Sequence, residues 1–107
     1  MGPVTFVETK LFTRLVQEYL TDDQYATFQQ SLIANPEAGD VIPGSGGVRK
    51  VRWRVAGRGN RGGIRVIYFL RLRRGEIWML TLYAKNVAEN IPAEVLKKIK
   101  EEIDAEG

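Results

Sequence analysis

Two apolar stretches in the second half of the chain are separated by only three residues. Residues 64–72 (IRVIYFLRL) and 76–84 (EIWMLTLYA) carry apolar side chains on both faces of an extended chain, as strands inside a sheet do. Arg73-Arg74-Gly75 joins them, and a link this short cannot make the crossover that parallel neighbours require. The two stretches are therefore predicted to form an antiparallel hairpin of central strands.

A strand before this hairpin has a different pattern. Apolar and basic residues alternate along it; the apolar members are Val51, Trp53 and Val55, and the basic members are Lys50, Arg52 and Arg54. A period of two places the apolar set on one face and the basic set on the other. A solvated face is the simplest interpretation. Because three neighbouring like charges repel, we favour an anionic partner for the basic face.

The first third of the chain has a helical period. Apolar residues recur three and four positions apart over residues 10–20 and 22–34. Thr9 and Thr21 precede these segments as expected of N-caps, and Gln24 completes the capping-box spacing with Thr21. The spacing predicts two consecutive helices.

The remaining segments complete the expected element order. Residues 4–7 form a short β-prone run, and residues 36–47 are rich in turn formers. Pro92 suits the first turn of a final helix. We therefore expect a single α+β domain over residues 1–107. It would have an N-terminal strand and αα-hairpin, then an antiparallel meander and a C-terminal helix, with the helices on one face of the sheet.

Charge is distributed unevenly along the chain. No acidic residue occurs from Val41 to Gly75, although the net charge is only +3. The same region holds ten basic residues, nine of them arginine: Arg49, Lys50, Arg52, Arg54, Arg58, Arg61, Arg65, Arg71, Arg73 and Arg74. The planar arginine fork binds phosphate through two hydrogen bonds and stacks on bases. This asymmetry favours a nucleic-acid partner, most simply RNA.

Composition excludes several kinds of chemistry. The chain has no cysteine and no histidine, so it lacks disulfides, thiolate metal sites and the commonest general base. Catalysis would depend on Lys, Arg, Tyr or acidic side chains, and we expect no metal and no cofactor. Apolar runs are far shorter than the ~18–20 residues of a membrane span, and the N-terminus lacks a signal-peptide pattern. We expect a cytoplasmic protein without a membrane partner.

Two further segments are candidates for a site. Leu82-Tyr83-Ala84-Lys85-Asn86 places a phenol, a cation and an amide at the end of a strand, although a capped turn would use similar residues. The glycine-rich residues 56–63 carry Arg58 and Arg61, which would meet phosphates from a basic connection. Glycines are also common in ordinary turns, so a plain turn and a phosphate-binding connection are both compatible with these residues.

In ordered combination, five segments resemble the RelE/HigB superfamily of toxins from bacterial type II toxin–antitoxin modules, and within it the HigB-like branch. The segments are VTFVET at 4–9, NPEAGDVI at 35–42, GGVRKVR at 46–52, RGGIRVIY at 61–68 and LTLYAKN at 80–86. The resemblance spans nearly the whole chain. It implies the RelE-like fold and a ribosome-dependent endoribonuclease that cuts mRNA in the decoding site and is blocked by a partner antitoxin, expected to be a helix-turn-helix protein.

The resemblance also divides the cations by role. It implies catalytic roles for five residues: Lys50, Arg52, Arg65, Tyr83 and Lys85. The RNA-binding set would be Arg49, Arg54, Arg58, Arg61 and Tyr68. The chain has no obvious counterpart of the tyrosine that some relatives place after the last strand. By this hypothesis the arginines hold developing charge, Lys50 or Lys85 moves a proton, and Tyr83 positions a base.

Three other functions are compatible with the same residues. One is a ParE-like gyrase inhibitor on the same fold, although a cationic cleft is not needed for that activity. Another is a non-enzymatic RNA-binding module, and the third is an interaction domain whose arginines meet only an acidic antitoxin. All of them place the site on the basic surface.

Overall fold

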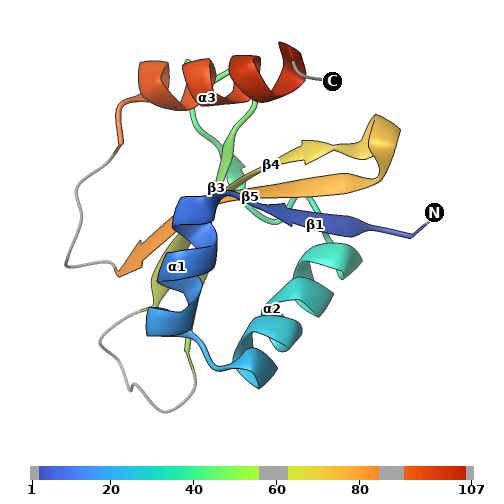
Figure 1. Ribbon diagram of the computed structural model, residues 1–107, viewed down its shortest axis with the longest axis vertical. Helices are drawn as coiled ribbons and strands as arrows, with labels where there is room; N and C mark the ends of the chain where they lie inside the picture. The colour runs from blue at the N-terminus through green and yellow to red at the C-terminus, as the bar shows by residue number, and fades with distance from the viewer. Residues whose placement is uncertain (1–2, 56–62, 85–90, 106–107) are drawn as a thin grey trace.

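A five-stranded sheet in the order β1-β5-β4-β3-β2 organises the chain in the computed structural model, which describes residues 3–55, 63–84 and 91–105 (Figure 1). The elements are β1 (Thr5–Glu8), α1 (Lys10–Tyr19), α2 (Asp22–Ala34), β2 (Asp40–Val41), β3 (Arg49–Trp53), β4 (Ile64–Arg71), the 3-10 turn η1 (Leu72–Arg74), β5 (Glu76–Ala84) and α3 (Ala93–Ala105). This is the α+β class that the sequence predicts, and the predicted elements occur in the predicted order, with β2 and η1 in addition.

The central hairpin is confirmed. β4 and β5 pair antiparallel from Arg71 opposite Glu76 to Ile64 opposite Ala84. One irregularity interrupts the ladder beside Ile67 and Tyr68 of β4, where the pairing with β5 shifts register. A bulge of this kind bends and twists the strands locally. β1 adds to the far side of β5 in parallel, so the sheet is mixed rather than wholly antiparallel.

Both predicted N-terminal helices begin at the predicted caps. The Thr9 hydroxyl accepts a hydrogen bond from the Phe12 amide at 3.0 Å and donates to the Leu80 carbonyl at 2.7 Å, which ties the start of α1 to β5. Thr21 and Gln24 form the complete capping box at the start of α2. Both caps satisfy backbone amides that the first helical turn leaves unpaired.

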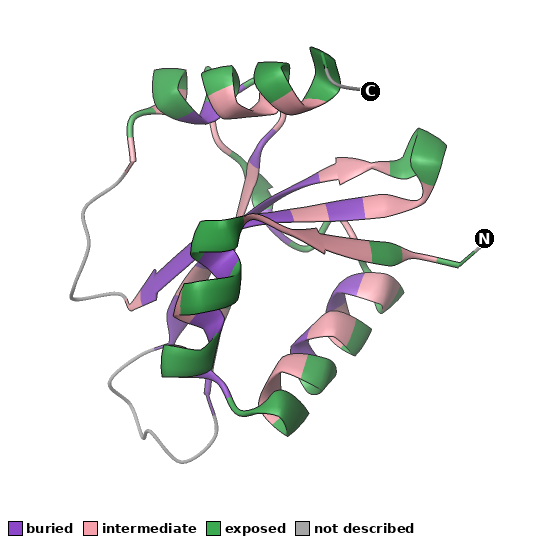
Figure 2. Cartoon of the chain, in the orientation of Figure 1, coloured by how far each residue is buried: buried purple, intermediate pink, exposed green. Residues whose placement is uncertain are grey.

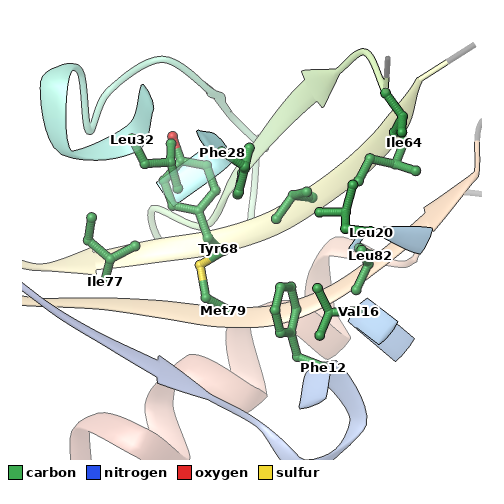
Figure 3. Packing of buried hydrophobic residues seen from close by; sticks show 12 residues of the cluster. Phe12, Val16, Leu20, Phe28, Leu32, Ile64, Tyr68, Ile77, Met79 and Leu82 are labelled. Carbon is green, nitrogen blue, oxygen red and sulfur yellow. The ribbon is translucent and has the colours of Figure 1, made fainter. Parts of the chain in front are cut away.

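The helices do not share one face of the sheet, and this corrects the sequence-based expectation. α1 and α2 cover one face, where Phe12, Phe28 and Tyr68 belong to the larger core (Figure 3). α3 lies on the opposite side (Figures 1 and 2), and its Leu96 is buried in a second core with Phe69. The central strands are apolar on both faces, and a helix layer on each face is what removes both from water.

The turn-rich segment before β3 also contains a short strand that the sequence did not predict. Asp40 and Val41 pair with Lys50 and Arg49, which makes β2 a two-residue edge of the sheet. The rest of the predicted loop remains irregular, with positive φ angles at Gly44, Gly46 and Gly47.

Candidate nucleic-acid interface

A row of three side chains crosses the sheet at the end remote from the β4–β5 turn. Arg52 on β3 lies opposite Arg65 on β4, and Arg65 lies opposite Tyr83 on β5. Directly paired residues project to the same face of a sheet and lie within reach of one another. We call Arg52, Arg65 and Tyr83 the cross-strand row. The pairing between strands thus brings Arg65 and Tyr83, which are distant in sequence, beside Arg52 of the predicted basic strand.

Lys50 lies on β3 with Arg52, two residues nearer the start of the strand and on the same face. It pairs with Ile67, two residues along from the pair formed by Arg52 and Arg65, and it is partly exposed. Arg52 is exposed, and Arg54 follows the end of β3 and is also exposed. The alternation therefore predicted the shared face of Lys50 and Arg52 correctly, while the strand ends one residue before Arg54.

Arg65 holds an unfavourable position in this row. Its Nη1 atom is buried and has no hydrogen-bond partner in the part of the chain that the structure describes. A buried donor left unpaired costs roughly 1–3 kcal/mol, and like charges directly opposite each other in a sheet add to the cost. An anionic oxygen at this point would accept a charge-assisted hydrogen bond from Arg65. It would thereby pair the buried donor and offset the repulsion between the two arginines.

Tyr83 closes the row on the other side. Its side chain belongs to the core beneath α3, and only 9% of the residue is exposed. The amphipathic phenol suits such a boundary between core and solvent. Tyr83 can therefore present only a small part of its surface to a ligand beside Arg65.

Three of the predicted site residues have no described position. Lys85, Arg58 and Arg61 lie outside the described residues. Their roles stay as predicted from the sequence, and the cross-strand row does not include them.

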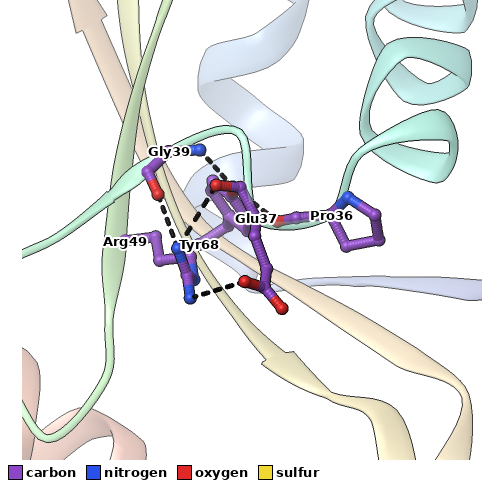
Figure 4. A network of polar contacts seen from close by, with 5 residues as sticks. All are labelled: Pro36, Glu37, Gly39, Arg49 and Tyr68. Atoms are coloured by element: carbon purple, nitrogen blue, oxygen red, sulfur yellow. Dashed lines mark hydrogen bonds and ion pairs between the residues drawn. The ribbon is translucent and has the colours of Figure 1, made fainter.

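Arg49 and Tyr68 have structural partners on the opposite side of the sheet (Figure 4). The buried Tyr68 hydroxyl donates to the Pro36 carbonyl at 2.8 Å and accepts from the Gly39 amide at 2.8 Å. The guanidinium of Arg49 donates to the Gly39 carbonyl at 2.7 Å and lies 3.9 Å from a carboxylate oxygen of Glu37. Residues 36–39 are thus fastened to β3 and β4.

The burial of Tyr68 argues against the RNA-binding role that was expected for it. The residue is 0% exposed, and burial raises the pKa of its hydroxyl, so the phenol stays neutral as both donor and acceptor. A Cβ atom on Gly39 would lie 2.9 Å from the Tyr68 ring, which explains a glycine there. We assign Tyr68 to loop anchoring and leave it out of the interface. Apart from Pro36 and Gly39 themselves, no sequence signal points to this loop contact.

Replacement of Tyr68 by phenylalanine is expected to lower the free energy of unfolding by roughly 1–3 kcal/mol, because the Gly39 amide and the Pro36 carbonyl both lose their partner. Urea denaturation of the variant and its parent measures this. Tyr19→Phe is the matched control, since the Tyr19 hydroxyl makes no hydrogen bond to the described residues. Equal losses in both variants would contradict the anchoring role.

Neither a metal cluster nor a membrane-spanning helix occurs in the described part of the chain. Over residues 3–55, 63–84 and 91–105 no three potential metal ligands among acidic, histidine and cysteine side chains come together. None of the described helices combines the length and apolarity needed to cross a bilayer.

The chain resembles several solved structures, among them two that contain RelE, while no protein-family model matches it. One is a variant of the E. coli toxin RelE with two arginines replaced by alanine, in the free state. It aligns with a TM-score of 0.54 and 13% identity over 97% of this chain and 98% of that one. The other is the RelE–RelB complex of the archaeon Pyrococcus horikoshii, with a TM-score of 0.52 and 24% identity over 81% and 100%.

These likenesses establish the RelE fold for the chain. They confirm the predicted fold class, and each alignment covers nearly the whole length of the matched chain. Function at this level of identity has to be argued from the site, because one fold carries many activities.

Proposed function

We propose that the chain is the toxin of a toxin–antitoxin pair and cleaves mRNA on the ribosome. The observation that carries the proposal is the cross-strand row, in which Arg52 and Arg65 face each other and Arg65 keeps a buried nitrogen unpaired within the described residues. An RNA phosphate supplies the anion that this arrangement lacks. The RelE fold supports the same conclusion, and the HigB-like motifs refine it to that branch.

The chemistry fits a chain without histidine. The ribose 2′-oxygen attacks the adjacent phosphorus, a 2′-oxygen–phosphorus bond forms, and the bond to the 5′-oxygen breaks. The products are a 2′,3′-cyclic phosphate and a 5′-hydroxyl. The 2′ proton passes to a base, and the departing 5′-oxygen gains a proton. Catalysis of this kind depends on positioning and on stabilising negative charge, which fixed guanidinium groups provide.

Each residue of the site then has a distinct role. Arg65 and Arg52 hold the charge that develops on the phosphate, and Tyr83 positions a neighbouring base through the small part of its surface that is exposed. Lys50, two residues from Arg52 on the same face, is the described candidate for moving a proton, with Lys85 as the other. The exposed Arg54 and the arginines at 49, 58 and 61 would contribute to the positive field that attracts RNA.

The partners follow from the same proposal. The chain would act in the cytoplasm on ribosome-bound mRNA, and an antitoxin would block it. The Pyrococcus RelE structure is a complex with RelB, which supports an antitoxin partner. We expect that partner to be a helix-turn-helix protein from the resemblance alone.

Expression of the chain in bacteria should produce new mRNA ends within seconds to minutes of induction. We expect 5′-hydroxyl ends at codon-linked positions of translated messages, arrested growth, and cleavage by the purified protein on ribosomes supplied with Mg²⁺ as the only divalent cation. Sequencing of 5′-hydroxyl RNA ends measures the cuts. Growth arrest with loss of DNA supercoiling and no RNA cuts would replace the proposal with the gyrase function. Salt-sensitive RNA binding without arrest would indicate a binding module.

A further inference from the structure

A pocket lies at the tip of the β4–β5 hairpin, at the opposite end of β4 from Arg65. Its volume is about 560 Å³, within the range of sites that hold small ligands or parts of larger ones. The lining combines three arginines with two leucines and one acid: Arg71, Arg73, Arg74, Leu70, Leu72 and Asp104. We call this set the hairpin pocket.

The turn that carries the pocket is held in place. The Gly75 amide donates to the Leu72 carbonyl at 3.0 Å, which closes η1, and Gly75 has the left-handed φ of 67° that favours glycine. The Gly75 carbonyl accepts from the Thr5 amide at 2.8 Å, which binds the tip of the hairpin to β1. Arg73 and Arg74 therefore project from a fixed backbone.

The acids around the pocket are already engaged. Asp104 accepts from Lys100 at 2.8 Å and lies 3.9 Å from the guanidinium of Arg71. Arg71 also lies 3.9 Å from Glu76, whose other contact is the Trp78 indole N–H at 3.1 Å. In the described part of the chain neither Arg73 nor Arg74 forms an ion pair. Both are exposed, so two positive charges remain for a ligand.

The pocket is separate from the cross-strand row. Arg65 and Arg71 are six residues apart on β4, which corresponds to about 20 Å along a strand. Between them α3 covers the same face, where Lys100 lies 5.5 Å over the Phe69 ring and Leu96 packs in the same core. One phosphate cannot contact both places, whereas an extended polyanion can.

We propose that the hairpin pocket binds the phosphodiester backbone of RNA and docks the chain on RNA away from the cleavage site. All cations on the pocket wall are arginine, whose fork fits two phosphate oxygens, and the apolar Leu70 and Leu72 offer a surface for ribose and base. This docking does not require that the chain cleaves RNA.

Binding of a fluorescent RNA dodecamer tests the pocket. With 2′-O-methyl groups throughout, the probe has no free 2′-hydroxyl to attack its phosphates, and anisotropy of the full chain gives the dissociation constant at several salt concentrations. For Arg73→Gln/Arg74→Gln we expect affinity to fall on the order of ten-fold at 0.1 M salt. The slope of log affinity against log salt should fall by roughly 0.7 for each phosphate that the variant no longer neutralises. Asp104→Asn should bind RNA several-fold more tightly, because a negative charge leaves the pocket.

Arg14→Gln is the matched control, because Arg14 is an exposed arginine on α1 without an ion pair in the described residues. The inference is overturned if the double variant binds RNA as tightly as Arg14→Gln at an unchanged urea midpoint. It is also overturned if the double variant loses only binding of an octaglutamate peptide, which would make an acidic protein the ligand. Failure of the proposed function would give a different result. In that case the parent would not cut mRNA, but RNA binding would still depend on Arg73 and Arg74.

Discussion

Replacement of Arg65 by methionine is expected to slow cleavage of translated mRNA by roughly 10²–10³-fold without lowering the stability of the chain. The loss follows if Arg65 holds charge that develops on the phosphate in the transition state. The preserved stability follows from its position, because Nη1 of Arg65 is buried without a partner in the described residues, opposite Arg52. Methionine removes this unpaired donor and keeps a long apolar side chain against the sheet.

The difference between the two effects makes this variant informative. A residue needed for folding loses stability and activity together, whereas a group placed for ligand binding loses activity alone. Cleavage by the purified protein on programmed ribosomes and urea denaturation give the two readings. Arg65→Lys is the companion variant: it keeps the charge and loses the planar fork, and we expect it to recover only part of the rate. Parental cleavage by Arg65→Met would remove Arg65 from the mechanism.

Local sequence signals predicted the separate elements well. Thr9 and Thr21 start helices because a side-chain oxygen there pairs with amides of the first turn, and this depends only on neighbouring residues. The hairpin follows from three linking residues and two apolar runs. These features belong to short stretches of chain, which is why they can be recognised without a structure.

The placement of α3 could not be predicted in the same way. Its apolar stripe, which includes Leu96, fits either face of a sheet whose central strands are apolar on both. The choice depends on which face α1 and α2 already occupy and on the path of the chain after β5. β2 likewise depends on distant contacts, since Tyr68 and Arg49 anchor residues 36–39 beside it.

The candidate site shows the same division. Alternation placed Lys50 and Arg52 on one face of β3, but their relation to Arg65 and Tyr83 is a matter of register between strands. Register is set by the whole sheet, including the bulge beside Tyr68. The sequence placed Arg73 and Arg74 among the cations that favour a nucleic-acid partner. It did not place them in a pocket, because the pocket also requires Asp104 from α3.

Phe12→Ala is expected to lower the free energy of unfolding by about 3–5 kcal/mol. Phe12 is 0% exposed and packs in the core between α1 and the sheet, with its ring centroid 5.8 Å from that of Tyr25 on α2. Truncation removes its buried apolar surface and leaves a cavity, because the sheet behind it cannot move inward freely. Urea denaturation measures the change, and the slope of the transition checks that unfolding remains cooperative.

Leu11→Ala is the control on the same helix. Leu11 is 43% exposed, so its replacement should change the unfolding free energy far less than that of its neighbour. Native domains are stable by only about 5–15 kcal/mol, and a loss of the expected size takes much of this margin. The hydrogen bond from Thr9 to the Leu80 carbonyl holds the start of α1 on β5 in the variant too. If this contact keeps α1 in place, the loss should lie near the lower end of the range of about 3–5 kcal/mol. A loss no greater than that of Leu11→Ala would mean that α1 does not pack on the sheet through Phe12.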